Sequence, residues 1–160
     1  MTGSGGFAGP GKVQFDGGYA PGSFFGSRLA SVAFEGDLAL GATNALTMEL
    51  GGTSPGTGYD RLTVGGLATL GGSLNVVRLS DFALAPGQSF DLFDFSLWNG
   101  QFSSVNLPTL GSDLKWDTST LYANGTIRVQ SVPEPTTVLS LSLGALALLR
   151  RKRAAAKKAA

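Results

Sequence analysis

The chain contains neither cysteine nor histidine, and only 14% of its 160 residues are charged. Without cysteine there is no disulfide framework and no thiolate metal site. Without histidine the commonest general base and the commonest metal ligand are missing, which excludes Ser-His-Asp catalysis and histidine-bound zinc. We therefore expect a protein that is not an enzyme, with no catalytic residues, no metal and no cofactor.

Basic residues are scarce in most of the chain and concentrated at its end. Residues 1–132 carry six Lys or Arg and ten Asp or Glu, a net charge of −4, whereas six of the twelve basic residues stand at or after Arg150. A mildly acidic body has no electrostatic attraction for a phosphate backbone. We therefore expect no nucleic-acid partner.

Helical periodicity is absent before residue 136, and short alternating segments separated by glycine-rich turns take its place. Residues 45–50 and 59–64 alternate apolar and polar side chains, which is typical of half-buried strands. Further short strands are expected at 101–107, 114–116 and 126–129. Residues 89–95 predict one strand with a register shift between Leu92 and Phe93, where the apolar positions change parity.

This pattern predicts an all-β body. A β-solenoid similar to a right-handed β-helix fits best, because each coil can turn at glycine and stack its apolar row on the next coil. A flattened β-sandwich has the same number of strands and is the alternative. The division is a Gly-rich loop or remnant of an upstream repeat at 1–31, a β-rich domain at 32–130, and a tail at 131–160.

Several residue sets could suggest chemistry, but each has a simpler explanation. Gly65-Gly66 and Gly71-Gly72 predict tight corners with positive φ, since no lysine or helix follows to make a phosphate loop. Asp91 and Asp94 would point to opposite faces of a regular strand, and although a bulge could bring them together as a carboxylate pair, we expect them to face solvent. Aspartates beside glycines lack the regular spacing of calcium-binding β-rolls. Four aromatic residues could form a sugar-stacking platform, but we expect them to pack in the core or at the solenoid end: Tyr59, Trp98, Trp116 and Tyr122.

The tail has three blocks in a fixed order. Pro133, Glu134 and Pro135 predict an exposed extended segment, because each proline fixes φ and removes an N–H donor. Residues 136–149 are uncharged and would span about 21 Å as a helix, less than the roughly 30 Å of a bilayer core. The apolar positions of this short hydrophobic helix are Val138, Leu139, Leu141, Leu143, Leu146, Leu148 and Leu149.

A basic cluster follows the apolar run: Arg150, Arg151, Lys152 and Arg153. By the positive-inside rule this cluster is a cytoplasmic anchor that leaves the body outside. The start of the chain lacks the charged and apolar regions of a secretion signal. An export-type end without an export-type start leads us to expect the C-terminal piece of a longer protein, or a gene start placed too late.

The ordered blocks closely resemble the PEP-CTERM sorting signal of Gram-negative bacteria. The resemblance covers residues 132–153 and implies recognition by an exosortase, a membrane cysteine transpeptidase that cuts near Pro-Glu-Pro. It implies an exported precursor held transiently in the inner membrane through residues 136–149. The mature body would then reach the cell surface or extracellular matrix, with exopolysaccharide as a further partner. An ordinary permanent membrane anchor is the alternative.

The body resembles the final coils of autotransporter-type β-helical passenger proteins. Residues 58–76 carry the resemblance through a Tyr-Asp-x-Leu-x-Val-x-Gly rung followed by Leu-Gly-Gly-x-Leu, and the similarity extends over about 36–130. It implies a surface-exposed structural module with a capped end. Two other functions stay open: a fragment of an extracellular polysaccharide-active β-helix enzyme, and a carbohydrate-binding module.

Overall fold

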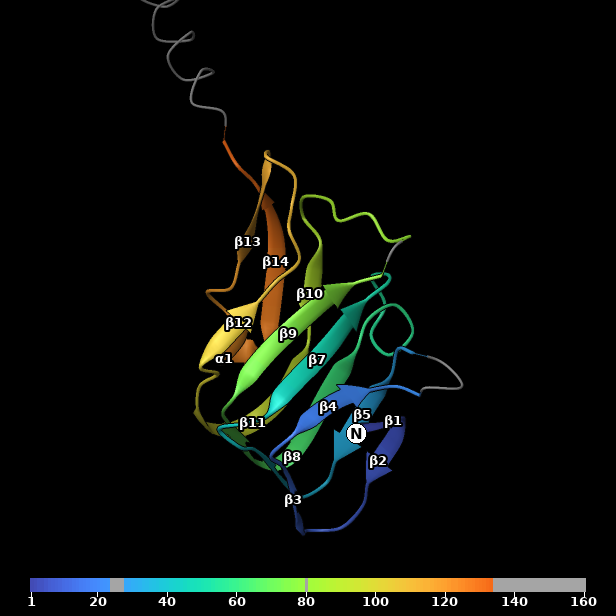
Figure 1. Cartoon of the computed structure of the whole chain (residues 1–160), viewed down its shortest axis with the longest axis vertical. Coiled ribbons are helices and arrows are strands. Elements are labelled where there is room, and N and C mark those ends of the chain that lie inside the picture. Colours follow the sequence, from blue (N-terminus) through green and yellow to red (C-terminus); the bar gives the residue numbers. More distant parts are fainter. Residues whose placement is uncertain (24–27, 80, 134–160) are drawn as a thin grey trace, which may run out of the picture.

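The computed structural model describes residues 1–23, 28–79 and 81–133. They form a β-solenoid of about three turns, with a small antiparallel sheet at one end (Figure 1). The solenoid has two sheets of parallel strands. The first has the order β1-β4-β7-β9-β12. Its strands are β1 (Thr2–Gly3), β4 (Gly18–Pro21), β7 (Ala45–Leu50), β9 (Ser73–Arg78) and β12 (Ser104–Asn106).

The second sheet is organised around one long strand. β8 (Arg61–Leu70) pairs in parallel with two strands of the preceding coil and, on its other side, with β11 (Phe93–Gly100). The remaining strands are β2 (Gly5–Phe7), β3 (Lys12–Phe15), β5 (Ser31–Phe34) and β6 (Asp37–Leu40). Both sheets therefore gain one rung with each coil.

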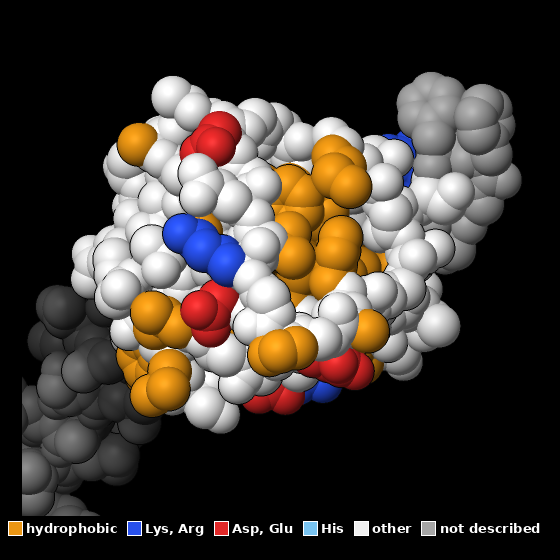
Figure 2. Space-filling model, turned by 90° about the horizontal axis from the view of Figure 1, so that it is seen from below, with side chains coloured by type: hydrophobic (Ala, Val, Ile, Leu, Met, Phe, Trp, Pro, Cys, Tyr) orange, Lys and Arg blue, Asp and Glu red, His pale blue; other side chains and the backbone are white. Residues whose placement is uncertain are grey.

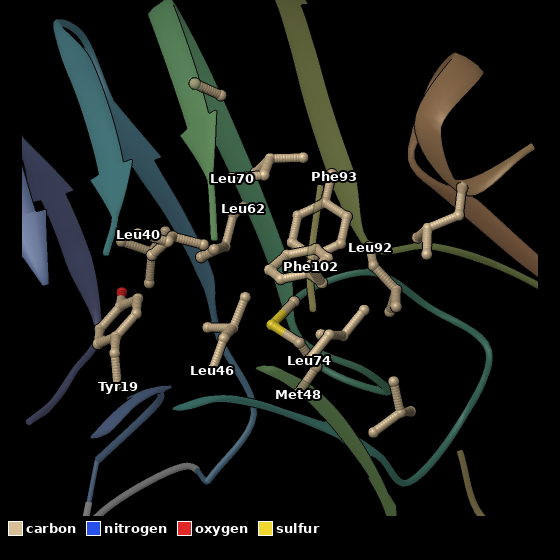
Figure 3. Close-up of a cluster of buried hydrophobic side chains, with 14 of the residues drawn as sticks. Tyr19, Leu40, Leu46, Met48, Leu62, Leu70, Leu74, Leu92, Phe93 and Phe102 are labelled. Carbon is tan, nitrogen blue, oxygen red and sulfur yellow. The ribbon is translucent and has the colours of Figure 1, made fainter. Parts of the chain in front are cut away.

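Equivalent apolar residues stack from coil to coil and make the core. Leu62 is opposite Val32 on one side and Phe93 on the other, and all three are buried. In the first sheet Leu74 is likewise opposite Leu46. Figure 3 shows Leu46, Leu62, Leu74 and Phe93 converging between the two sheets. Burial of these rows is the main source of stability, since each coil covers the apolar row of its neighbour.

The glycine pair Gly65-Gly66 lies inside β8 instead of at a corner, and neither residue has a positive φ. A Cβ at Gly65 would stand 2.8 Å from the carbonyl oxygen of Glu35, and one at Gly66 would stand 2.7 Å from the carbonyl carbon of Gly36. The pair is thus required by the close approach of two coils. Of the expected corner glycines, only Gly72 has a positive φ, at 66°.

A third, antiparallel sheet covers one end of the core, beside the last coil. It consists of β10 (Ser89–Asp91), β13 (Leu114–Asp117) and β14 (Thr126–Ser131), with β14 in the centre and both pairings antiparallel. A one-turn helix, α1 (Leu121–Asn124), precedes β14. We call these four elements the cap. Phe90, Leu121, Ile127 and Val129 bury their side chains beneath it.

Gly125 joins the cap to the last coil. Its φ is 74°, and a Cβ there would lie 1.8 Å from the carbonyl oxygen of Phe93. Its own carbonyl accepts the N–H groups of Leu92 (3.0 Å) and Phe93 (3.3 Å). Only glycine combines this left-handed backbone with such a close approach.

The predicted solenoid is confirmed, and the sandwich is excluded for the described residues because strands of successive coils pair in parallel. The strand expected at 45–50 coincides with β7. Two expectations need correction. Within 1–31, the described residues 2–21 form the strands β1 to β4, which pair with the next coil, so the expected loop is wrong there, while the alternative of a remnant of an upstream repeat stays a prediction. Residues 89–95 are two strands in two sheets, because Leu92 and Phe93 are both buried and the chain changes sheet at Leu92, between the end of β10 and the start of β11.

The end of the solenoid away from the cap is less covered. β2 and β3 lie there, at the bottom of Figure 1, and Figure 2 shows apolar side chains gathered in the middle of this face. Phe7 and Val13 are only partly buried, and with Phe34 they line a recess. Phe7 stacks on Phe34 with ring centroids 4.7 Å apart. The two ends of the core thus differ in how completely side chains cover them.

Candidate functional site at the end of the cap

The predicted sorting motif begins where the cap ends. β14 pairs with β13 through Trp116 opposite Val129 and Leu114 opposite Ser131. One further backbone hydrogen bond follows, in which the Val132 N–H donates to the carbonyl of Asp113 at 2.8 Å. The side chains after Val129 are exposed, through Pro133. The folded body therefore reaches the first proline of the predicted motif.

Polar contacts hold the strands that lead to this end. The Gln130 side-chain amide donates to the Asp117 carboxylate at 2.6 Å, and the Trp116 Nε1–H donates to the carbonyl of Pro108 at 2.8 Å. The Ser119 hydroxyl and N–H beside Asp117 lower the pKa of that carboxyl, because both favour its charged form. The segment between β12 and β13 is thereby fixed against the cap.

Most of the predicted tail lies outside the described residues. Pro133 is described and exposed. Glu134, Pro135, the predicted membrane-spanning positions and the basic cluster Arg150, Arg151, Lys152 and Arg153 are not, so their roles remain predictions. Among the residues that are described, no helix has the length and apolar character needed to cross a bilayer.

Asp91 and Asp94 are partly exposed, with 39% and 58% of their side chains accessible, as expected, but they do not point apart as on a regular strand. Both carboxylates contact the Arg61 Nη2, at 2.8 Å and 3.0 Å. They meet because Asp91 ends a cap strand and Asp94 belongs to β11, beside β8. Burial raises the pKa of Asp91, while Arg61 acts in the opposite direction. This cluster ties the cap to the last two coils.

The four aromatic residues considered for sugar stacking do not form one platform. Tyr59 is buried and its hydroxyl accepts the N–H of Asp91, while the Tyr122 hydroxyl accepts the N–H of Phe102. Trp116 is half-buried and packs 6.2 Å from Phe90. Only Trp98 is exposed, at 38%, beside Phe95. Three of the four residues therefore serve packing, as expected.

One buried acid was not anticipated. Asp60 is fully buried just before β8, and its two carboxylate oxygens accept the N–H groups of Ala30 and Glu49, each at 2.8 Å. It thus links β8 to both sheets of the preceding coil. Burial raises its pKa to about 7, against the two amide hydrogen bonds, which favour the carboxylate.

The described residues do not gather acids in the way a metal site needs. Across residues 1–23, 28–79 and 81–133, no group of three or more Asp or Glu side chains is placed to hold a metal ion. Asp37 illustrates the alternative use of such residues, because its Oδ1 accepts the N–H of Leu67 in the next coil at 2.8 Å. The aspartate beside a glycine serves here to stack coils.

The fold and the position of this site define a protein with a β-solenoid body and a C-terminal tail that is processed. Residues 131–153 match the model of the PEP-CTERM protein-sorting motif. Such motifs are recognised by exosortases, and they imply a secreted, membrane-transiting precursor that an exosortase processes. No curated protein and no solved structure matches the chain. The sorting motif is therefore shown for the tail, and the solenoid is shown for the body.

Proposed function

We propose that this protein is a non-enzymatic structural module displayed at the cell surface or in the extracellular matrix after an exosortase removes its tail. The observation that carries the proposal is the position of the PEP-CTERM motif, which begins at Ser131, the last residue of the cap. A cut beyond Pro133 would leave every described strand in the mature body. The fold would keep its core, because Ile127 and Val129 lie upstream of the cut.

The arrangement of the body supports a structural role. A stack of coils with buried apolar rows is a stiff, extended unit, which suits display outside the cell. Its polar groups serve coil-to-coil contacts: Asp60 holds two backbone amides, and Asn106 donates to Asn75 of the preceding coil at 2.8 Å. The mild negative charge of residues 1–132 keeps such a body soluble. We propose that the mature body lies within exopolysaccharide outside the cell.

The test is processing of the full-length chain in matched hosts with and without an exosortase. We expect the peptides of residues 136–160 to be lost only in the host with the enzyme, by mass spectrometry, and the body to move from the membrane fraction to the surface or medium. A variant with Pro133→Ala and Pro135→Ala serves as the matched control and is expected to stay uncut. Retention of residues 136–160 in both hosts would show that the tail is a permanent anchor.

A further inference from the structure

The sorting motif overlaps the folded cap. The matched segment starts at Ser131, which is the last residue of β14 and is paired with Leu114 of β13. The next residue, Val132, is held by the hydrogen bond from its N–H to the Asp113 carbonyl at 2.8 Å. The first two residues of the motif are therefore part of the fold.

The strand that contains Ser131, β14, is held in the fold by its upstream residues. β14 is the central strand of the cap, between β10 and β13. Ile127 and Val129 are 0% and 1% exposed, whereas the side chains of residues 130–133 are exposed. The end of β14 can open from Gln130 onward without uncovering the core, but it can open no further at low cost.

An enzyme that cuts near Pro133–Pro135 needs more chain than the cap leaves free. Enzymes and receptors that take extended peptides bind their main chain by strand-like pairing. Pro135 is the third residue after Val132, and a fully extended chain covers at most about 11 Å between them. The N–H of Val132, which such pairing would use, already donates to the Asp113 carbonyl, and Ser131 stands opposite Leu114 at a non-hydrogen-bonded position of the ladder.

From this overlap we infer that opening of the last two pairings of β14, Ser131 with Leu114 and Val132 with Asp113, controls access of the exosortase to this motif. The inference rests on the proposed function, because it concerns the same processing step. Opening a strand end is among the least costly local motions of a fold. The cap thereby sets the processing rate while it keeps the cut downstream of the core.

The absence of native cysteine allows a reversible lock at this pairing. Directly opposed residues of antiparallel strands have Cα atoms about 4.5–5.5 Å apart, within the disulfide range of about 4.4–6.8 Å. The full-length Leu114→Cys/Ser131→Cys chain, in detergent, is oxidised or reduced, freed of reagent and mixed with exosortase-containing membranes. We expect the oxidised form to be processed at least tenfold more slowly than the reduced form.

A second cysteine pair is the matched control. Ser89 of β10 is opposite Arg128 of β14, so a Ser89→Cys/Arg128→Cys disulfide joins the cap without holding its end. We expect this variant to be processed at the rate of the unaltered chain in both redox states. Slowing in both cysteine variants would overturn the inference, because it would show that any stiffening of the cap matters equally.

A spacer variant leaves the cap sequence intact and covers the case in which a cysteine variant fails to fold. Six Gly and Ser residues inserted between Val132 and Pro133 are expected to raise the processing rate several-fold. The same insertion after Arg153 is expected to leave it unchanged. An unchanged rate with the first spacer overturns the inference while exosortase-dependent cleavage still stands. Failure of the unaltered chain to be cut beside an active exosortase overturns the proposed function and the inference together.

Discussion

The coils and the cap bury similar apolar side chains but are joined in different ways. In the coils, strands pair in parallel with residues of neighbouring turns, so each row could accept a further rung. In the cap, β10, β13 and β14 pair antiparallel, and β14 turns its fully buried Ile127 toward the core. The comparison teaches that this solenoid is closed by a change from parallel to antiparallel pairing, and β14 is the last strand of the described residues.

We expect the largest loss of stability from a mutation at the contact between the coils and the cap. Phe90 is fully buried in β10, with its ring 5.5 Å from Tyr59 of the coils and 6.2 Å from Trp116 of the cap. We expect Phe90→Ala to lower the free energy of unfolding by about 3–5 kcal/mol, because it removes a large side chain and leaves a cavity. Urea unfolding would measure this, with Trp98→Ala, at an exposed ring, costing below about 1 kcal/mol as the control.

The contact of Gly125, within the cap, with Phe93 of the last coil gives a sharper test. Gly125 and Gly87 both have positive φ, at 74° and 87°, but only Gly125 is crowded, since no atom lies within 4 Å of a Cβ at Gly87. We expect Gly87→Ala to cost about 1–2 kcal/mol from backbone strain. Gly125→Ala should cost about 2 kcal/mol more, because the added methyl forces the cap away from β11. Equal losses in thermal unfolding would contradict the described packing at Phe93.

The buried acid Asp60 makes the stability of the coils sensitive to pH. Asp60 has a folded-state pKa of about 7, whereas an unfolded aspartate has a pKa near 3.9. The folded state therefore holds this proton more tightly, so stability is highest in mild acid and falls as the pH rises from about 4 to about 7. We expect a loss of about 1–3 kcal/mol across that range. Asp60→Asn should flatten the pH profile, and a profile that stays as steep would exclude Asp60 as its source.

The Arg61 cluster is expected to contribute least. Its side chain is 26% exposed and those of Asp91 and Asp94 are 39% and 58% exposed, so water screens both ion pairs. We expect Arg61→Gln to cost about 0.5–1 kcal/mol in low salt and less in 1 M salt. Urea titrations at the two salt concentrations would measure the difference. A loss above about 3 kcal/mol would mean that the cluster behaves as a buried network.

Local sequence signals predicted what depends on neighbouring residues. The alternation at 45–50 coincides with β7, and the ordered tail blocks predicted the sorting motif. β14 continues to Ser131, two residues beyond the predicted end at 129, because the alternation of apolar and polar residues stops at Gln130 and Ser131, which are both polar. The overlap of fold and motif was therefore not predicted from the alternation.

Contacts between coils could not be predicted in the same way. Asp60 is buried because Ala30 and Glu49 present their N–H groups to it, and their sequence separation depends on the coil register. The Arg61 cluster likewise depends on the break at Leu92, which moves Asp91 into the cap. Alternation gives the face of a side chain within its own strand, and not the residue that a distant coil places opposite it.

The central claim is that the sorting motif is cut at or shortly after Pro133 and that the coils and the cap stay intact in the mature protein. The intact mass of the exported protein, made in a host with an active exosortase, tests this most directly. We predict a single mature C-terminus at or shortly after Pro133, with all of β14 retained. A mature protein that still carries residues 136–160, or one cut upstream of Ser131, would contradict the account.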